Sequence, residues 1–100
     1  MLFFVSLRLR SESAPPETLT PALVKREVQR IHELLASGIV VNAWKRTEGI
    51  AIVLLLEVAN EVACRAVLGA LPSSQAGVLE IEMIVAVEPY LDVYPDPSRG

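Results

Sequence analysis

The stretch Val40–Val58, VVNAWKRTEGIAIVLLLEV, decides the fold because it predicts two strands joined by a short charged turn. We place the strands at residues 39–46 and 50–58, with Gly49 in the turn where a positive φ is useful. The seven apolar residues Ile50–Leu56 are too few to span a membrane and are typical of a strand covered on both faces. Helices of the chain can cover one face, and we expect a second subunit to cover the other.

The rest of the chain supplies two helices and two more strands. Residues 3–10 alternate between apolar and mixed positions, as a strand does. A helix is predicted at 21–37, with Thr20 as N-cap and Gly38 as its left-handed end. A second helix follows the N-cap Asn60, the polar stretch 71–77 breaks the chain, and a last strand runs over 78–87. The first helix has an apolar stripe that we expect to be buried: Val24, Val28, Ile31 and Leu35.

This order, β-α-β-β-α-β, predicts an α+β fold of the ferredoxin-like type, with a four-stranded antiparallel sheet and both helices on one face. Residues 1–89 form the single domain that a chain of 100 residues allows. In the last strand we expect Leu79, Ile81, Met83 and Val85 to alternate with Glu80, Glu82, Ile84 and Ala86. The proline-rich tail, residues 90–100, carries apolar side chains and is predicted to pack on a partner subunit.

Composition narrows the classes of partner and location. An apolar fraction of 52% and a mean hydropathy of +0.44 are high for a small monomer, so we expect a homodimer or a larger ring. No apolar run approaches the ~20 residues of a spanning helix, which argues against a membrane protein. Nine Lys and Arg against twelve Asp and Glu leave no basic excess for nucleic acid. The single cysteine, Cys64, favours a reducing cytoplasm.

The spacing of several residues resembles the muconolactone delta-isomerases, a family of the dimeric α/β-barrel superfamily. The likeness runs without a gap from Leu23 to Pro72, and LEIEM at 79–83 resembles the family's last strand. The matching positions are Arg26, Glu27, Glu33, Leu34, Gly38, Trp44, Lys45, Ala51, Glu57, Val58, Leu68, Leu71 and Pro72. The chain differs in having polar residues at 73–77 instead of an aromatic, proline-containing segment, and Asn42 where a histidine is frequent.

The resemblance implies a cofactor-free isomerase that moves a double bond in a small unsaturated lactone or acidic metabolite during aromatic catabolism. It also implies that Glu27 is a candidate base and that Arg26 binds substrate, either at the edge of a pocket or in an interface. Two alternatives stay open. One is a cofactor-independent monooxygenase or cyclase of the same superfamily, and the other is a non-catalytic ligand-binding or oligomerisation module.

Charged residues of the strands supply further candidates for the chemistry. Glu80 and Glu82 share one face of the last strand, so either carboxylate is a candidate base if that face lines a closed barrel. Arg8 and Arg46 are candidate ligands for a substrate carboxylate, because a guanidinium matches its geometry with two hydrogen bonds. The same charges fit an alternative in which the two arginines pair with the two glutamates.

Aromatic side chains are the candidates for the walls of the pocket. Trp44, the only tryptophan, and Phe4 fall on the face that also carries the charged residues, although a tryptophan in a small protein is more often part of the core or an interface. His32, the only histidine, has no second histidine or cysteine at a spacing suited to a metal. No phosphate-binding or dinucleotide glycine pattern occurs. The sequence therefore predicts a small-molecule site without metal or cofactor.

Overall fold

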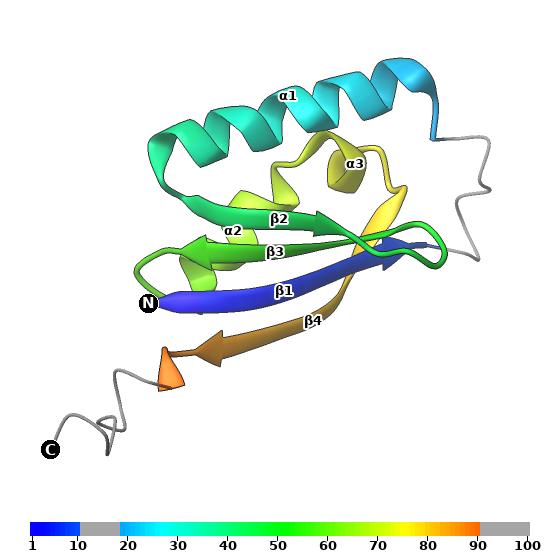
Figure 1. Ribbon diagram of the computed structural model, residues 1–100. Helices are drawn as coiled ribbons and strands as arrows, with labels where there is room; N and C mark the ends of the chain where they lie inside the picture. The colour runs from blue at the N-terminus through cyan, green and yellow to red at the C-terminus, as the bar shows by residue number, and fades with distance from the viewer. Residues whose placement is uncertain (11–18, 91–100) are drawn as a thin grey trace, which may run out of the picture.

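The computed structural model describes residues 1–10 and 19–90 of the chain, which form one sheet and three helices (Figure 1). The elements follow the predicted order, with one short helix added before the last strand. They are β1 (Leu2–Leu9), α1 (Pro21–Ser37), β2 (Val40–Lys45), β3 (Ala51–Glu57), α2 (Glu61–Gly69), α3 (Pro72–Gln75) and β4 (Leu79–Val87). None of the helices within the described ranges is long and apolar enough to cross a membrane.

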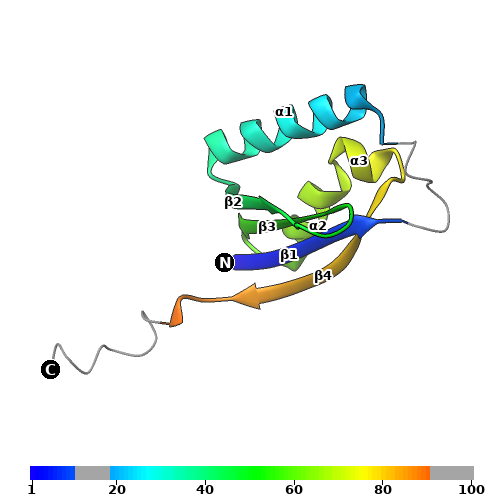
Figure 2. The same cartoon turned by 45° about the vertical axis from the view of Figure 1, so that its right-hand side comes forward.

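The four strands form one antiparallel sheet in the order β2-β3-β1-β4. The connections through α1 and α2 each pass over a neighbouring strand, which is the split β-α-β arrangement of ferredoxin-like folds. Figures 1 and 2 show the helices gathered on one face of the sheet, while the opposite face is uncovered. The predicted α+β, ferredoxin-like architecture is therefore confirmed. We call the uncovered side of the sheet the open face.

Local signals in the sequence set the ends of the elements. The Thr20 hydroxyl accepts a hydrogen bond from the Leu23 amide at 3.2 Å, and the Asn60 side chain accepts one from the Ala63 amide at 2.9 Å. Gly38 ends α1 with φ +82°, and Gly49 lies in the turn between β2 and β3 with φ +70°. Residues that carry a side chain rarely adopt a positive φ. Both predicted N-caps and both predicted glycine positions are confirmed.

The core lies between the sheet and the helices. Its strand residues include Phe3, Val5 and Leu7 of β1 with Leu54 and Leu56 of β3, all almost completely buried. The helices add Leu23, Leu34, Cys64 and Leu68, and Leu71 follows α2. Burial of such side chains stabilises the fold by about 1.5–3 kcal/mol each, so this layer is the main source of stability.

The predicted buried stripe of α1 is wrong. Leu23 and Leu34 are buried, whereas Val24, Val28 and Leu35 are 38–49% exposed and only Ile31 of the predicted set is partly buried against the core. The reason is that α1 contacts both α3 and β2. In this orientation its apolar stripe faces a space between the helix and the strands β2 and β3. Apolar periodicity gives a face of the helix but not which neighbour will cover it.

A bulge in β4 overturns the strict alternation expected for this strand. Ser6 of β1 pairs with Met83, but the next residue, Leu7, pairs with Ile81, so Glu82 is an extra residue in β4. As a result Met83 and Val85 share the open face with Glu80, while Ile84 packs against the core. Side chains alternate regularly between the core and the open face before and after the bulge. Odd-numbered residues face the core before Glu82 and the open face after it.

The polar stretch 71–77 contains a short helix where we expected only a chain break. Pro72 occupies the first turn of α3, where its missing amide hydrogen costs no hydrogen bond. The helix buries Ser73 completely against α1. Except for Tyr90, the predicted docking tail, residues 90–100, lies outside the described residues.

Candidate functional site

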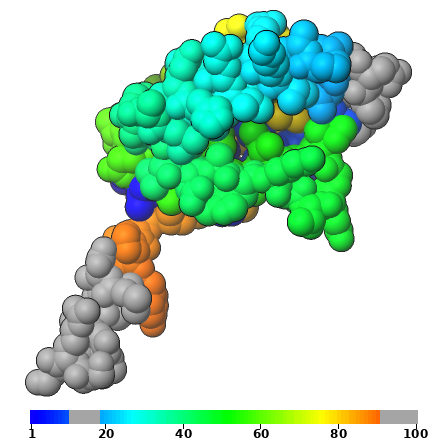
Figure 3. All heavy atoms as spheres, turned by 45° about the horizontal axis from the view of Figure 1, so that its top comes forward, coloured from blue at the N-terminus to red at the C-terminus, as the bar shows by residue number. Residues whose placement is uncertain are grey.

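A cleft opens between α1 and the strands β2 and β3. It consists of two cavities of about 380 and 290 Å³ that share four lining residues, Glu27, Val28, Lys45 and Ile52. Figure 3 shows the hollow between the cyan spheres of α1 and the green spheres of the β2–β3 hairpin. We call the larger cavity, which also borders Ser73 and Leu79, the α3 arm, and the smaller one, which also borders Leu35 and Trp44, the β2 arm.

The exposed stripe of α1 explains why this cleft exists. Val24 and Val28 line the α3 arm, and Val28, Ile31 and Leu35 line the β2 arm. The opposite wall comes from side chains on the helix-facing side of β3, including Ile52 and Leu54. Apolar side chains that a well-packed domain would bury thus line an open space, which is typical of a ligand site.

Glu27 places a carboxyl group in this apolar cleft. Its Oε2 accepts a hydrogen bond from the Ser73 hydroxyl, whereas its Oε1 is buried and has no hydrogen-bond partner among the described residues. Burial raises the pKa of the Glu27 carboxyl above its usual value of 4.5, and a hydrogen bond from the Ser73 backbone amide opposes the shift. A buried carboxyl oxygen without a partner is costly, and at a functional site such a group is available for proton transfer.

A carboxyl group with a raised pKa can both take and return a proton. General acid-base catalysis is most efficient when the pKa of the catalytic group lies near the working pH, and burial moves Glu27 in that direction. The arrangement therefore suits a reaction in which one group removes a proton from carbon and delivers it back to the same molecule.

Ser73 is the functional neighbour that sequence reasoning missed. It lies 46 positions after Glu27, and the polar composition of the stretch after Pro72 predicts a break in the chain rather than part of the site. Its complete burial and its hydroxyl bond to Glu27 give it a role in orienting the carboxylate. The signal that could have found it is a serine directly after a Leu-Pro pair that starts a helix.

Replacing Ser73 by alanine should raise the pKa of Glu27 further, because the hydroxyl donates to the ionised carboxylate and stabilises its charged form. A carbon-detected NMR titration of the labelled Glu27 carboxyl measures this directly. Ser74→Ala is the matched control, because Ser74 lies in the same helix and does not line the cleft. An unchanged or lowered pKa in Ser73→Ala would contradict the proposed contact.

Lys45 brings the positive charge to the cleft. It is the only lysine or arginine among the described residues that line the two arms, and it borders both of them. It pairs across the sheet with Ile52, on the helix-facing side of the strands. His32, an exposed residue of α1, borders the β2 arm only. An anionic ligand that enters either arm therefore meets a cation at the junction.

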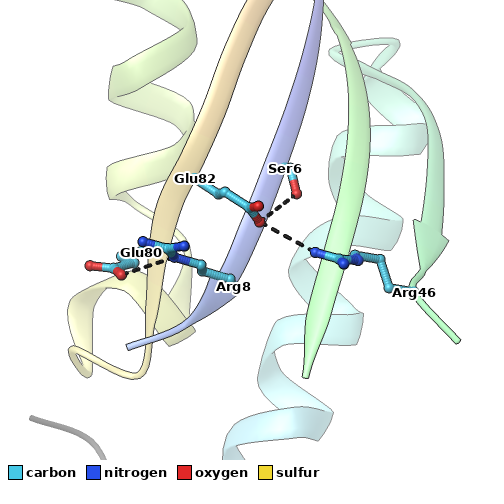
Figure 4. A network of polar contacts seen from close by, with 5 residues as sticks. All are labelled: Ser6, Arg8, Arg46, Glu80 and Glu82. Carbon is cyan, nitrogen blue, oxygen red and sulfur yellow. Dashed lines mark hydrogen bonds and ion pairs between the residues drawn. The ribbon is translucent and has the colours of Figure 1, made fainter. Parts of the chain in front are cut away.

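The other predicted carboxylates lie on the open face, outside the cleft. Figure 4 shows Glu82 reaching over β1 toward Ser6 and Arg46, with contacts of 3.2 and 3.4 Å, and Glu80 paired with Arg8 at 3.2 Å. All four charged side chains are 34–56% exposed. The structure thus places Glu80 and Glu82 in the ion pairs that the sequence offered as the alternative to a catalytic role.

The remaining predicted residues divide between the two sites. Phe4 is half-buried on the open face, opposite Leu55 and Val85. Trp44 pairs with Val53 of the open face and, because β2 is an edge strand, also borders the β2 arm. Arg26 is an exposed residue of α1. Of the three candidate bases, Glu27 alone lies in the cleft.

Comparison with known proteins identifies one family. The family model described as muconolactone delta-isomerase matches residues 1–94. A search of curated protein sequences found no match. Within the described ranges, no group of three or more His, Cys, Asp or Glu side chains is arranged to hold a metal ion.

Proposed function

We propose, since the chain belongs to the muconolactone delta-isomerase family, that it is a cofactor-free isomerase acting on a small unsaturated lactone or acidic metabolite. The observation that carries the proposal is the half-buried Glu27, which lines both arms of the cleft and whose Oε1 is buried without a hydrogen-bond partner among the described residues. Arrangements of this kind move protons between carbon atoms, which is the chemistry of double-bond migration. We place the reaction in the cytoplasm, in the catabolism of aromatic compounds.

In the proposed reaction the Glu27 carboxylate removes a proton from the carbon next to a carbon-carbon double bond of the lactone. The electron pair of that C–H bond forms a new carbon-carbon double bond, the electrons of the old double bond move into the bond to the carbonyl carbon, and the carbonyl π electrons move to the oxygen, which gives an enolate. Glu27, now protonated, returns the same proton to the carbon at the other end of the three-carbon unit. No atom is gained or lost, and the negative charge passes from Glu27 to the enolate and back.

Lys45 has two uses in this scheme. Its ammonium group binds the carboxylate of an acidic substrate at the junction of the two arms, and its charge lowers the energy of the enolate. The apolar walls strengthen both effects once a bound substrate has displaced water from the cleft, because charges attract more strongly in an apolar surrounding. The cleft thus combines a base, a cation and an apolar surface.

The direct test is proton NMR in D₂O with muconolactone as the probe. We expect isomerisation, and any exchange of the proton held by Glu27 should appear as deuterium at the two carbons between which it moves. Oxygen consumption measured in parallel separates this reaction from that of a monooxygenase. The absence of both isomerisation and exchange, with muconolactone and with its ring-substituted analogues, would contradict the proposed function.

Replacing Lys45 by methionine should raise the KM for an acidic lactone about ten-fold, because the substrate carboxylate loses its charged partner. The change keeps the length and apolar stem of the side chain, so the fold should be retained. Lys25→Met is the matched control, since Lys25 is an exposed residue of α1 that does not line the cleft. Equal KM values in the two variants would show that Lys45 does not bind the substrate carboxylate.

We further propose that the functional unit is a homodimer formed through the open face. Trp44, Met83 and Val85 are 42–48% exposed there, and the partly buried Phe4 and Leu55 lie between them. A contiguous apolar patch of this kind is typical of an interface. Two copies packed face to face would enclose the patch and form the α/β barrel expected from the resemblance.

A further inference from the structure

The two arms of the cleft differ in their relation to Glu27. Ser73, which holds Oε2 of Glu27, lines the α3 arm and does not line the β2 arm. The carboxyl group is therefore anchored at the end of the cleft that the α3 arm occupies, and the proposed function places the reacting atoms of the substrate beside it. The β2 arm, with its volume of about 290 Å³, adjoins this place and borders no residue of α3.

The lining of the β2 arm is mostly apolar. Beyond the four shared residues it consists of Ile31, His32, Leu35, Ala43, Trp44 and Leu54. Its volume equals that of about ten water molecules, at ~30 Å³ of liquid for each, so the arm is large enough for a substituent of several carbon atoms. Water in such a space gains few hydrogen bonds, and its displacement by an apolar group favours binding.

From this geometry we infer that the β2 arm is a binding subsite for an apolar alkyl or aryl substituent carried by the acid or lactone that reacts in the α3 arm. The assignment of the reacting group rests on the proposed function, whereas the assignment of the substituent rests on the cleft alone. Lys45 stands at the junction, so the ligand has its carboxylate there and its apolar part beyond. The substrate class is a substituted unsaturated acid or lactone.

A series of straight-chain saturated carboxylates, from butanoate to decanoate, tests the subsite without any turnover. Each added methylene that enters an apolar site contributes about 0.8 kcal/mol, which corresponds to a roughly four-fold lower Kd. Trp44 is the only tryptophan and borders the arm, so its fluorescence reports binding, with titration calorimetry as a second measurement. We expect the Kd to fall about three- to four-fold per methylene until the arm is full.

Two matched variants of α1 identify which arm takes the chain. Leu35 lines only the β2 arm and Val24 lines only the α3 arm, and both side chains are partly exposed, so phenylalanine is tolerated at either position. Leu35→Phe should abolish the dependence of Kd on chain length, and Val24→Phe should keep it. The reverse pattern, or no dependence on chain length in the parent protein, would overturn the inference.

Lys45→Met separates binding in the cleft from adsorption to the open face. If the carboxylates bind in the cleft, the substitution should raise the Kd of every member of the series by about ten-fold. Unchanged Kd values would show that the chains adsorb elsewhere and would overturn the inference. Failure of the proposed function gives a different result. In that case the saturated acids still bind with the expected dependence on chain length, but no lactone is isomerised.

Discussion

Replacing Glu27 by glutamine should lower kcat by about 10²–10⁴-fold, the range that general acid-base catalysis contributes. Glutamine has nearly the same shape and still accepts the hydrogen bond from Ser73, but it cannot take a proton from carbon. The KM should change little, because the cavity keeps its size and Lys45 stays in place. Steady-state kinetics with the lactone substrate measure both quantities.

Glu33→Gln is the control for this experiment. Glu33 lies in the same helix and forms an exposed ion pair with Arg30, an interaction worth little in stability. Its substitution should leave kcat and KM within about two-fold of the parent protein, since the residue does not line the cleft. If Glu27→Gln retains more than about a tenth of the parent kcat, Glu27 is not the base.

Glu27→Gln should also change how the free energy of unfolding depends on pH. The pKa of Glu27 is raised in the folded protein, so the folded state binds this proton more tightly than the unfolded state does. The stabilising effect is fully present below about pH 4.5 and is lost as the pH rises through the folded-state pKa. Urea unfolding at pH 4.5 and pH 8 should therefore show a smaller loss of stability with pH in Glu27→Gln than in the parent protein. Equal losses in both proteins would contradict the raised pKa.

Replacing Val85 by lysine should convert a homodimer into monomers. Val85 lies on the open face opposite Phe4, and two copies packed through this face would bring two lysines into an apolar interface. Burying unpaired charges of like sign costs several kcal/mol, which corresponds to an increase of about 100-fold or more in the dimer Kd. Light scattering at micromolar concentration distinguishes the two masses.

Val62→Lys provides the comparison, because Val62 is 78% exposed on α2, on the helical side of the sheet. This variant should remain dimeric, and both variants should have the helical and strand content of the parent protein by circular dichroism. A monomeric mass for the parent protein, or a dimeric mass for Val85→Lys, would exclude the open face as the interface.

Much of the fold followed from local chemistry in the sequence. Thr20 and Asn60 as N-caps, Gly38 as helix end and Gly49 as turn residue each act over a few positions, so the ends of the main elements were predicted to within about two residues. The order of these elements then leaves few topologies, and the ferredoxin-like sheet is the one that keeps the connections short and right-handed.

The parts that could not be predicted depend on contacts between distant segments. The contact of Ser73 with Glu27 spans 46 positions, and the packing that brings them together half-buries the carboxyl group, which raises the pKa of Glu27 although the hydrogen bond itself lowers it. Which side of α1 faces the core depends on its packing against α3. The sequence of α3 has only four residues and shows no apolar pattern that would predict this contact. Glu80 and Glu82 form a clearer pattern in the sequence, but their ion-pair partners come from distant positions: Arg8 lies in β1 and Arg46 directly follows β2.

The bulge at Glu82 separates two halves of β4 whose outward-facing side chains differ in chemistry. Before it, the strand directs Leu79 into the core and Glu80 to an arginine, and after it, Met83 and Val85 turn outward and Ile84 turns inward. Regular pairing of the same residues without the bulge would set Ser6 opposite Glu82 and Val5 opposite Met83, so Met83 and Val85 would lie beneath the helices. The bulge thus decides, with no change in the apolar residues themselves, that this half of the strand presents them to the proposed partner rather than to the core.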